Sequence, residues 1–184
     1  MKVSLFWLAV AAAIIAAFTF GYPTWQDYMA QDAAKRQLRA YIEVKALGPR
    51  VLEAGAKLGV RDTVRNVGRT PAYDKGANPR VTIAEYPLAK SFSHERCDME
   101  APATDKSKWF VGKMSKPETT IEAPLDATQV DAIKGMKAAI YYHGRVCYRD
   151  IFGETHRTDF CMLWKWDAGR FSPALYCDQG NTFN

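Results

Sequence analysis

The chain begins with an apolar stretch, since residues 5 to 22 contain no charged side chain. Eighteen helical residues span roughly 27 Å, close to the ~30 Å hydrocarbon thickness of a bilayer. Trp7, Tyr22 and Trp25 stand where interfacial aromatic anchors are expected. The pattern predicts a membrane anchor over residues 1–25, favoured over a cleaved signal peptide because the best match to a cleavage site, at residues 19–21, is weak.

Residues 26–40 are rich in helix formers and predict a juxtamembrane helix. Asp32 and Arg36 are spaced for an i, i+4 ion pair on a solvated face, which we favour over contact of Lys35, Arg36 and Arg39 with anionic head groups. Lys2 and the lack of Lys or Arg between residues 21 and 34 favour an N-terminus inside the cell. The remaining chain would then face the periplasm from a single-pass anchor in the inner membrane.

From residue 41 the pattern changes to short runs of β-branched and aromatic residues separated by Gly and Pro. Such runs, with helix largely confined to the N-terminus, predict a mainly β domain over residues 41–184, an antiparallel sandwich or barrel. The expected strands are 41–44, 58–66, 70–75, 80–86, 138–150 and 158–166.

Two segments depart from this strand pattern. Asp126 or Thr128 can cap a short helix that Gly135 ends, so a helix is expected within residues 124–136. Residues 87–118 show no sustained period and are predicted to form a long loop.

The most patterned stretch is "GRVCYRDIFGETHRTDFCMLW", residues 144 to 164. A turn centred on Glu154 would place Val146 opposite Met162 and Tyr148 opposite Phe160 on an inward face. The other face would then hold two further pairs, Arg149 with Asp159 and Cys147 with Cys161.

This register makes a disulfide between Cys147 and Cys161 plausible, with Cys97 and Cys177 left for a second one. An even count of four cysteines in a domain facing an oxidising compartment supports two bridges. The other two connectivities stay open, as does a pair of buried reduced cysteines.

Composition and motifs exclude several function classes. The excess of 25 Lys and Arg over 20 Asp and Glu is scattered, without the basic run expected of a nucleic-acid surface. No spacing typical of a metal site, a haem attachment or a nucleophile elbow occurs, so we expect no cofactor, metal or catalytic residue. Asp150 and His156 flank the predicted hairpin turn, where a hydrogen-bonded brace is favoured over acid–base chemistry.

Two motifs, "VRNVGRTPAYD" and "YYHGRVCYRDIFGETHRTDFC", behind an apolar N-terminus resemble a set of uncharacterised proteobacterial membrane-anchored proteins. The resemblance implies an Ig-like β-sandwich in the cell envelope, over roughly residues 40 to 166, and no assigned activity. The landmark patterns are N-x-G-x-T-P-A and Y-x-D-x-F-G-x-x-H. The matching residues are Asn66, Gly68, Thr70, Pro71, Ala72, Tyr148, Asp150, Phe152, Gly153 and His156.

The landmark residues have structural interpretations of their own. Gly68 and Gly153 suit turns that need a positive φ, Asn66 can bond the backbone beyond it, and Pro71 fixes an extended start for the next strand. These positions are expected to specify the fold, because turn chemistry accounts for each of them.

Two functions remain. The first is a membrane-tethered interaction or accessory module without catalytic activity. It would contact lipid through its helix, and its candidate protein partner is another envelope protein. The alternative is an enzyme or small-ligand binder with Arg145 or Arg149 as an anion anchor. Its pocket would be lined by aromatic residues of the C-terminal half, which are Tyr141, Tyr142, Trp164, Trp166 and Tyr176.

Overall fold

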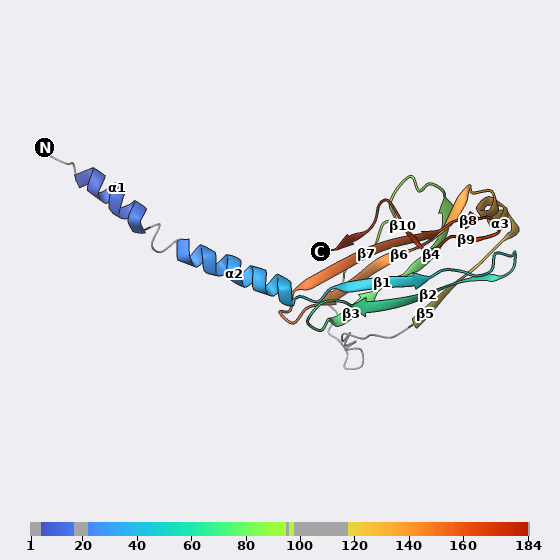
Figure 1. Cartoon of the computed structure of the whole chain (residues 1–184), viewed down its shortest axis with the longest axis horizontal. Helices are drawn as coiled ribbons and strands as arrows, with labels where there is room; N and C mark the ends of the chain where they lie inside the picture. Colours follow the sequence, from blue (N-terminus) through green and yellow to red (C-terminus); the bar gives the residue numbers. More distant parts are fainter. Residues whose placement is uncertain (1–4, 17–21, 95, 98–117, 184) are drawn as a thin grey trace. The chain divides into compact units, whose positions relative to one another are not determined.

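The computed structural model describes residues 5–16, 22–94, 96–97 and 118–183. The chain divides into two units, Met1–Arg39 and Ala40–Asn184. Figure 1 colours the elements along the sequence.

The first unit contains two helices, α1 (Leu5–Ala16) and α2 (Tyr22–Leu38). Neither they nor any other helix in the described ranges is long and apolar enough to cross a bilayer. The predicted anchor runs through residues 17–21, which lie outside the described residues. On α2 the predicted ion pair is confirmed, with Arg36 Nη2 2.7 Å from Asp32 Oδ2.

The second unit is built from antiparallel sheets, which confirms the prediction of a mainly β domain. The smaller sheet has the order β1-β2-β5, from Ile42–Leu47, Lys57–Asn66 and Glu118–Pro124. The larger sheet has the order β10-β7-β6-β3, and β11 also pairs with β7 and β4 with β6. Its strands are β3 (Tyr73–Ala77), β4 (Arg80–Glu85), β6 (Ala138–Arg149), β7 (Thr155–Trp164), β10 (Leu175–Tyr176) and β11 (Thr182–Phe183). A separate ribbon joins β8 (Trp166–Asp167) to β9 (Arg170–Phe171).

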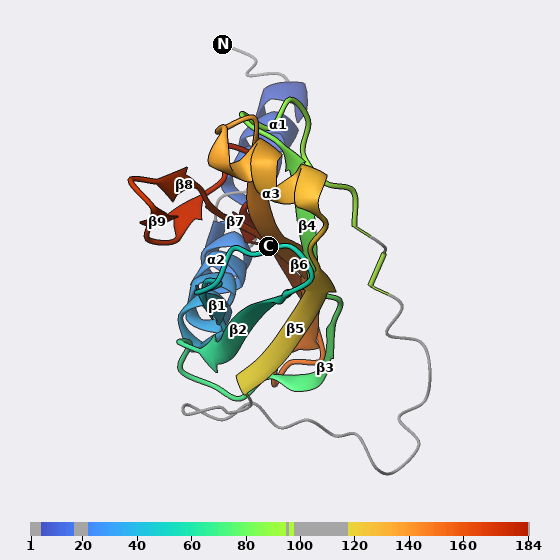
Figure 2. The same ribbon diagram turned by 90° about the vertical axis from the view of Figure 1, so that its right-hand side faces the viewer.

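The two sheets enclose the main core, and Figure 2 shows β5 beside β2 in the smaller sheet. Alternate residues of β2 are buried, as expected of a strand with one face on a core. Tyr142 of β6 crosses this core and donates a hydrogen bond of 2.6 Å to the buried carboxylate of Asp62 on β2. An immunoglobulin-like strand order stays a prediction.

The predicted short helix is confirmed as α3 (Ala127–Lys134). Asp126 is its N-cap and forms a reciprocal capping box with Gln129, while Gly135 follows the last turn. Val130 and Ile133 are buried in the main core, so the helix closes one end of it. Strand β5, which follows the segment predicted as a loop, was missed.

The register predicted for the β6–β7 hairpin is wrong: each β6 residue pairs with a β7 residue four positions earlier in the chain than predicted. Arg149 pairs with Thr155 and Arg145 with Asp159, so Cys147 faces Arg157 and does not face Cys161. The reason is that the turn comes earlier: Asp150 ends β6 by accepting hydrogen bonds from the amides of Phe152 and Glu154.

The faces of the hairpin, in contrast, are as predicted. Val146, Tyr148, Phe160 and Met162 all belong to the main core. The register shift is four residues, and because an even shift keeps each residue on the same face of the strand, every side chain keeps its predicted face. The alternation was therefore sufficient to identify the core face but not the cross-strand partners.

The outer face of the larger sheet is also covered. Tyr141, Cys161 and Leu163 form a second, smaller core with Cys177, against which Leu88 and Phe92 pack. The segment after β4 and the C-terminal residues therefore lie over β6 and β7, and their side chains bury what an open sheet would expose.

Candidate anion-binding site

Two disulfides anchor the segments that cover the outer face of the larger sheet. Cys97 is bonded to Cys147, and Cys161 is bonded to Cys177. The predicted pairs Cys147–Cys161 and Cys97–Cys177 are therefore wrong, because the register separates Cys147 and Cys161 along the hairpin. Each hairpin cysteine instead bonds to a segment lying on the sheet, and no cysteine is free.

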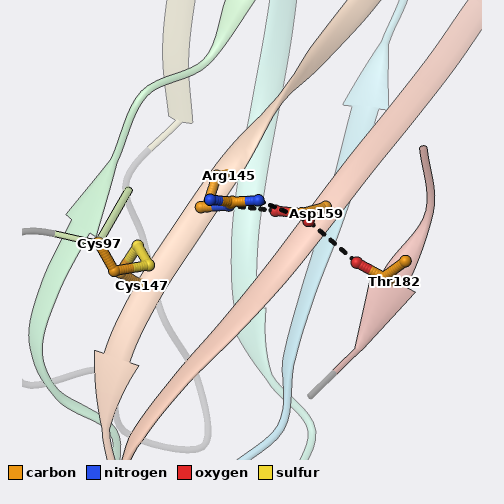
Figure 3. Close-up of a disulfide and its surroundings, with 5 residues drawn as sticks. All are labelled: Cys97, Arg145, Cys147, Asp159 and Thr182. Carbon is orange, nitrogen blue, oxygen red and sulfur yellow. Dashed lines mark hydrogen bonds and ion pairs between the residues drawn. A yellow bond between two sulfur atoms is a disulfide. The ribbon is translucent and has the colours of Figure 1, made fainter. Parts of the chain in front are cut away.

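Arg145, two residues before Cys147, lies on the same outer face (Figure 3). Its guanidinium donates two hydrogen bonds to Asp159 on β7, through Nε to Oδ1 and through Nη2 to Oδ2 at 2.9 Å. Thr182 of β11 donates a third to Oδ2 at 3.0 Å. Burial raises the pKa of Asp159, but these hydrogen bonds outweigh it, and the net pKa is lowered.

A cavity of about 470 Å³ lies beside Arg145. Three stretches far apart in the sequence line it: the end of β3 and its connection to β4, residues 93–94 with 96–97, and β6 at Arg145 and Cys147. We call it the arginine cavity after Arg80, Arg96 and Arg145, which line it together with His94. None of the described residues in its lining is acidic.

Two histidines lie close together at this site. Phe92 stacks on His143 with ring centroids 3.7 Å apart, and the His94 ring lies 5.5 Å from that of His143. Within the described residues, no hydrogen-bond partner reaches His94 Nε2 or His143 Nδ1. Thr82 Oγ1 lies 3.0 Å from the other ring nitrogen of His143.

The pKa values of both histidines are lowered. Burial is the main cause for His143, with further lowering from His94 and Arg80, and its pKa falls to about 4. For His94, burial lowers the pKa, Asp159 partly opposes this, and Arg145 and Arg80 lower it further. Arg80 thus lowers the pKa of both histidines, and because both pKa values lie below the ordinary value of 6.5, both imidazoles are neutral at pH 7.

The first landmark motif specifies a turn. Asn66 Oδ1 accepts hydrogen bonds from the amides of Tyr41 and Gly68, and its Nδ2 donates to Thr70 O at 2.7 Å. The predicted role of Asn66 is confirmed, and Pro71 directly precedes the β3 region. The positive φ expected at Gly68 is wrong: Gly68 is buried and absent from the left-handed region. The hydrogen bond from the Gly68 amide to Asn66 Oδ1 closes the turn without that conformation.

The second landmark motif braces the hairpin end. His156 Nε2 lies 2.7 Å from Asp150 Oδ2, and both side chains are buried. Gly153 has a φ of 80°, as predicted. Tyr148 donates to Ala40 O at 3.1 Å and so fixes the start of the domain to β6.

Asp150, Glu154 and His156 place potential ligand atoms within 4.8 Å of one another. Both oxygens of Asp150 are already engaged, Oδ1 by two backbone amides and Oδ2 by His156. These hydrogen bonds account for the cluster as a turn brace, which is the interpretation favoured from the sequence.

The aromatic residues considered for a pocket pack elsewhere. Tyr142 and Trp164 belong to the main core and Tyr141 to the second core, while Trp166 packs against the main core. Tyr176 is 66% exposed. Of the two anion anchors considered, Arg145 lines the arginine cavity.

Sequence reasoning missed Arg80, Arg96 and His94, which come from segments joined to β6 only in the fold. The alternation of β6 places Arg145 and Cys147 on one face, which was an available signal. If the Cys97–Cys147 disulfide had been predicted, Arg96 could have been placed next to Arg145 as well.

No protein-family model, curated protein or solved structure matches this chain. Its function is therefore inferred from the geometry of the arginine cavity.

Proposed function

We propose that this chain is a non-catalytic, membrane-tethered binding module that holds an anionic group of a ligand, or of another envelope protein, in the arginine cavity. The observation that carries this proposal is that three arginines and a histidine line one hollow whose described lining has no acidic residue. Guanidinium groups match carboxylates and phosphates with paired donors.

The surroundings favour a fixed site over a chance cluster of surface charges. The Cys97–Cys147 disulfide fastens the wall carrying Arg96 to the strand carrying Arg145. The amide of Asn78 donates to Arg145 O at 3.1 Å, which ties the β3–β4 connection to the same strand. An anion would therefore meet donors that are already positioned, and positioning limits the entropy lost on binding.

Location in the periplasm, behind a single-pass anchor in the inner membrane, is the second part of the proposal. Two disulfides support an oxidising compartment. The uncharged run of residues 5 to 22 supports the tether. Thiol alkylation in native membranes, with and without reduction, tests it: cysteines that react before reduction would refute the oxidising location.

Binding is tested on the full-length chain in mild detergent, with inorganic phosphate and acetate as probes. NMR of ¹⁵N-arginine-labelled protein follows the side-chain Nε–H signals during titration. We expect saturable shifts at Arg96 and Arg145, and about tenfold weaker binding in Arg96→Ala, because one charge-assisted hydrogen bond is lost.

Arg170→Ala is the matched control, since Arg170 is an exposed residue of β9 outside the cavity lining. It removes the same charge and should leave the titration unchanged. Equal weakening in both variants would indicate a general charge effect and refute a built site, as would titrations that do not saturate.

A further inference from the structure

A second hollow adjoins the arginine cavity. It measures about 240 Å³, and Arg96, Cys97 and Arg145 line both spaces. The rest of its lining consists of residues 155–157, at the start of β7. We call it the disulfide hollow, after the bridge that joins Cys97 to Cys147. Because the two linings share three residues, a ligand bound in the cavity can extend into this hollow.

The two spaces follow one another along the outer face of β6. Arg80, which lines only the arginine cavity, is paired with His143. Arg157, which lines only the disulfide hollow, is paired with Cys147. At ~3.4 Å per residue, Cys147 lies about 7 Å beyond Arg145 and about 14 Å beyond His143 along the strand. The cavity and the hollow therefore form one elongated site, longer than a single phosphate or carboxylate group.

Two guanidinium groups give the disulfide hollow its charge. Arg96 directly precedes Cys97 in the chain, and both residues line the hollow. Arg157 lies opposite Cys147, and the side chains of directly opposed strand residues share one face. Among the described residues, none forms an ion pair with Arg96 or Arg157, and none that lines the hollow is acidic. Both arginines are exposed, so the hollow offers a dissolved anion a second place that does not depend on Arg145, which is already in an ion pair.

The volume of the arginine cavity also points to a ligand larger than an inorganic ion. At about 470 Å³ the cavity falls within the range of roughly 300–1,000 Å³ that is typical of small-molecule sites. A single phosphate or acetate ion would leave most of this space to water. A longer ligand would fill it and would bring a second charged group to Arg157.

We propose that the ligand carries two anionic groups about 7 Å or more apart, one held in the arginine cavity and the other by Arg96 and Arg157 in the disulfide hollow. This inference rests on the proposed function, because it adds a second subsite to the same site. Once the first group is bound, the second binds from a high effective concentration, so the whole ligand binds more tightly than either group alone. A short aliphatic linker suits the boundary between the subsites, because the disulfide of Cys97 offers only weakly polar sulfur there.

Dicarboxylates of increasing length test this spacing at constant charge. Full-length ¹⁵N-arginine-labelled protein in mild detergent is titrated with acetate, malonate, succinate, adipate and suberate, and NMR follows the side-chain Nε–H signals. We expect suberate to bind about tenfold more tightly than malonate, because only the longer chain reaches both subsites. Equal affinities across the dicarboxylates would show that charge alone governs binding and would overturn the inference.

Arg157→Ala removes a donor of the second subsite. It should weaken suberate binding about tenfold and leave acetate binding unchanged, since acetate needs only the arginine cavity. Arg170→Ala is again the control, because it removes the same charge outside both linings, and it should change neither titration. Equal weakening of suberate in both variants, or equal weakening of acetate and suberate in Arg157→Ala, would overturn the second subsite.

The outcomes separate this inference from the proposed function. If the wild type binds acetate and phosphate but gains nothing from a second, distant carboxylate, the proposed function stands and the second subsite is refuted. If neither acetate nor phosphate binds, the proposed function is refuted and this inference falls with it. The length series uses the wild type alone, so it decides the question even if a variant fails to fold.

Discussion

Cys97 and Cys147 form a disulfide that links the segment over the larger sheet to β6, two residues from Arg145. Their Cα atoms lie 5.8 Å apart across a sequence separation of 50 residues. A crosslink of this span restricts the unfolded chain more than the Cys161–Cys177 bridge, whose separation is 16. The same bond also aligns two walls of the arginine cavity, so stability and binding both depend on it.

The first prediction concerns these bridges. Replacing both Cys97 and Cys147 by serine should lower the free energy of unfolding by about 4 kcal/mol. The same replacement of Cys161 and Cys177 should lower it by about 3 kcal/mol, because that disulfide closes a shorter loop. Urea unfolding measures both. Only the first variant should also lose phosphate binding. Non-reducing peptide maps that join Cys147 to Cys161 would contradict the fold.

The second prediction concerns the ion pair next to the cavity. The side chains of Arg145 and Asp159 are 15% and 10% exposed, so Asp159→Asn leaves a largely buried guanidinium without its counter-charge. We expect a loss of about 3 kcal/mol. Phosphate should then raise the melting temperature more in the variant than in the wild type, since the anion can replace the carboxylate.

Asp167→Asn is the control for this variant, because Asp167 is exposed on β8. It should change neither the melting temperature nor its response to phosphate. If phosphate stabilised wild type and Asp159→Asn equally, Arg145 would not belong to the anion site.

Features that depend on neighbouring residues could be predicted from the sequence, whereas features that depend on distant residues could not. The core face of the hairpin follows from alternation alone, and the helix after Asp126 follows from its capping residues. The register depended on where β6 ends, which Asp150 decides through hydrogen bonds to amides beyond it. The arginine cavity could not be predicted, because Arg80, Arg96 and Arg145 meet only after a disulfide has been assigned correctly.

The third prediction is a dependence of stability on acid pH through Asp150. Burial raises its pKa, but hydrogen bonds from His156 and from the amides of Glu154 and Phe152 outweigh this and hold the net pKa below its ordinary value. A lowered folded-state pKa contributes stability above the unfolded value of about 3.9, and that contribution is lost as pH falls through the folded value.

Urea unfolding between pH 6 and pH 2 tests this in wild type and Asp150→Asn. The variant should be less stable at pH 6 and should lose less stability on acidification. Parallel curves for the two proteins would show that Asp150 contributes nothing to the acid response.

The fourth prediction concerns close packing at Gly144, between His143 and Arg145 on β6. A Cβ there would lie 2.6 Å from Asn78 O and 2.9 Å from a ring carbon of Phe160, contacts that side chains do not tolerate. Gly144→Ala should therefore displace the β3–β4 connection and cost about 1–3 kcal/mol. Gly76→Ala is the control, because no described residue other than its chain neighbours lies within 4 Å of its Cβ position and it lines the same cavity. Chemical denaturation measures both, and equal stabilities would mean that the connection does not pack against β6 as closely as the structure shows.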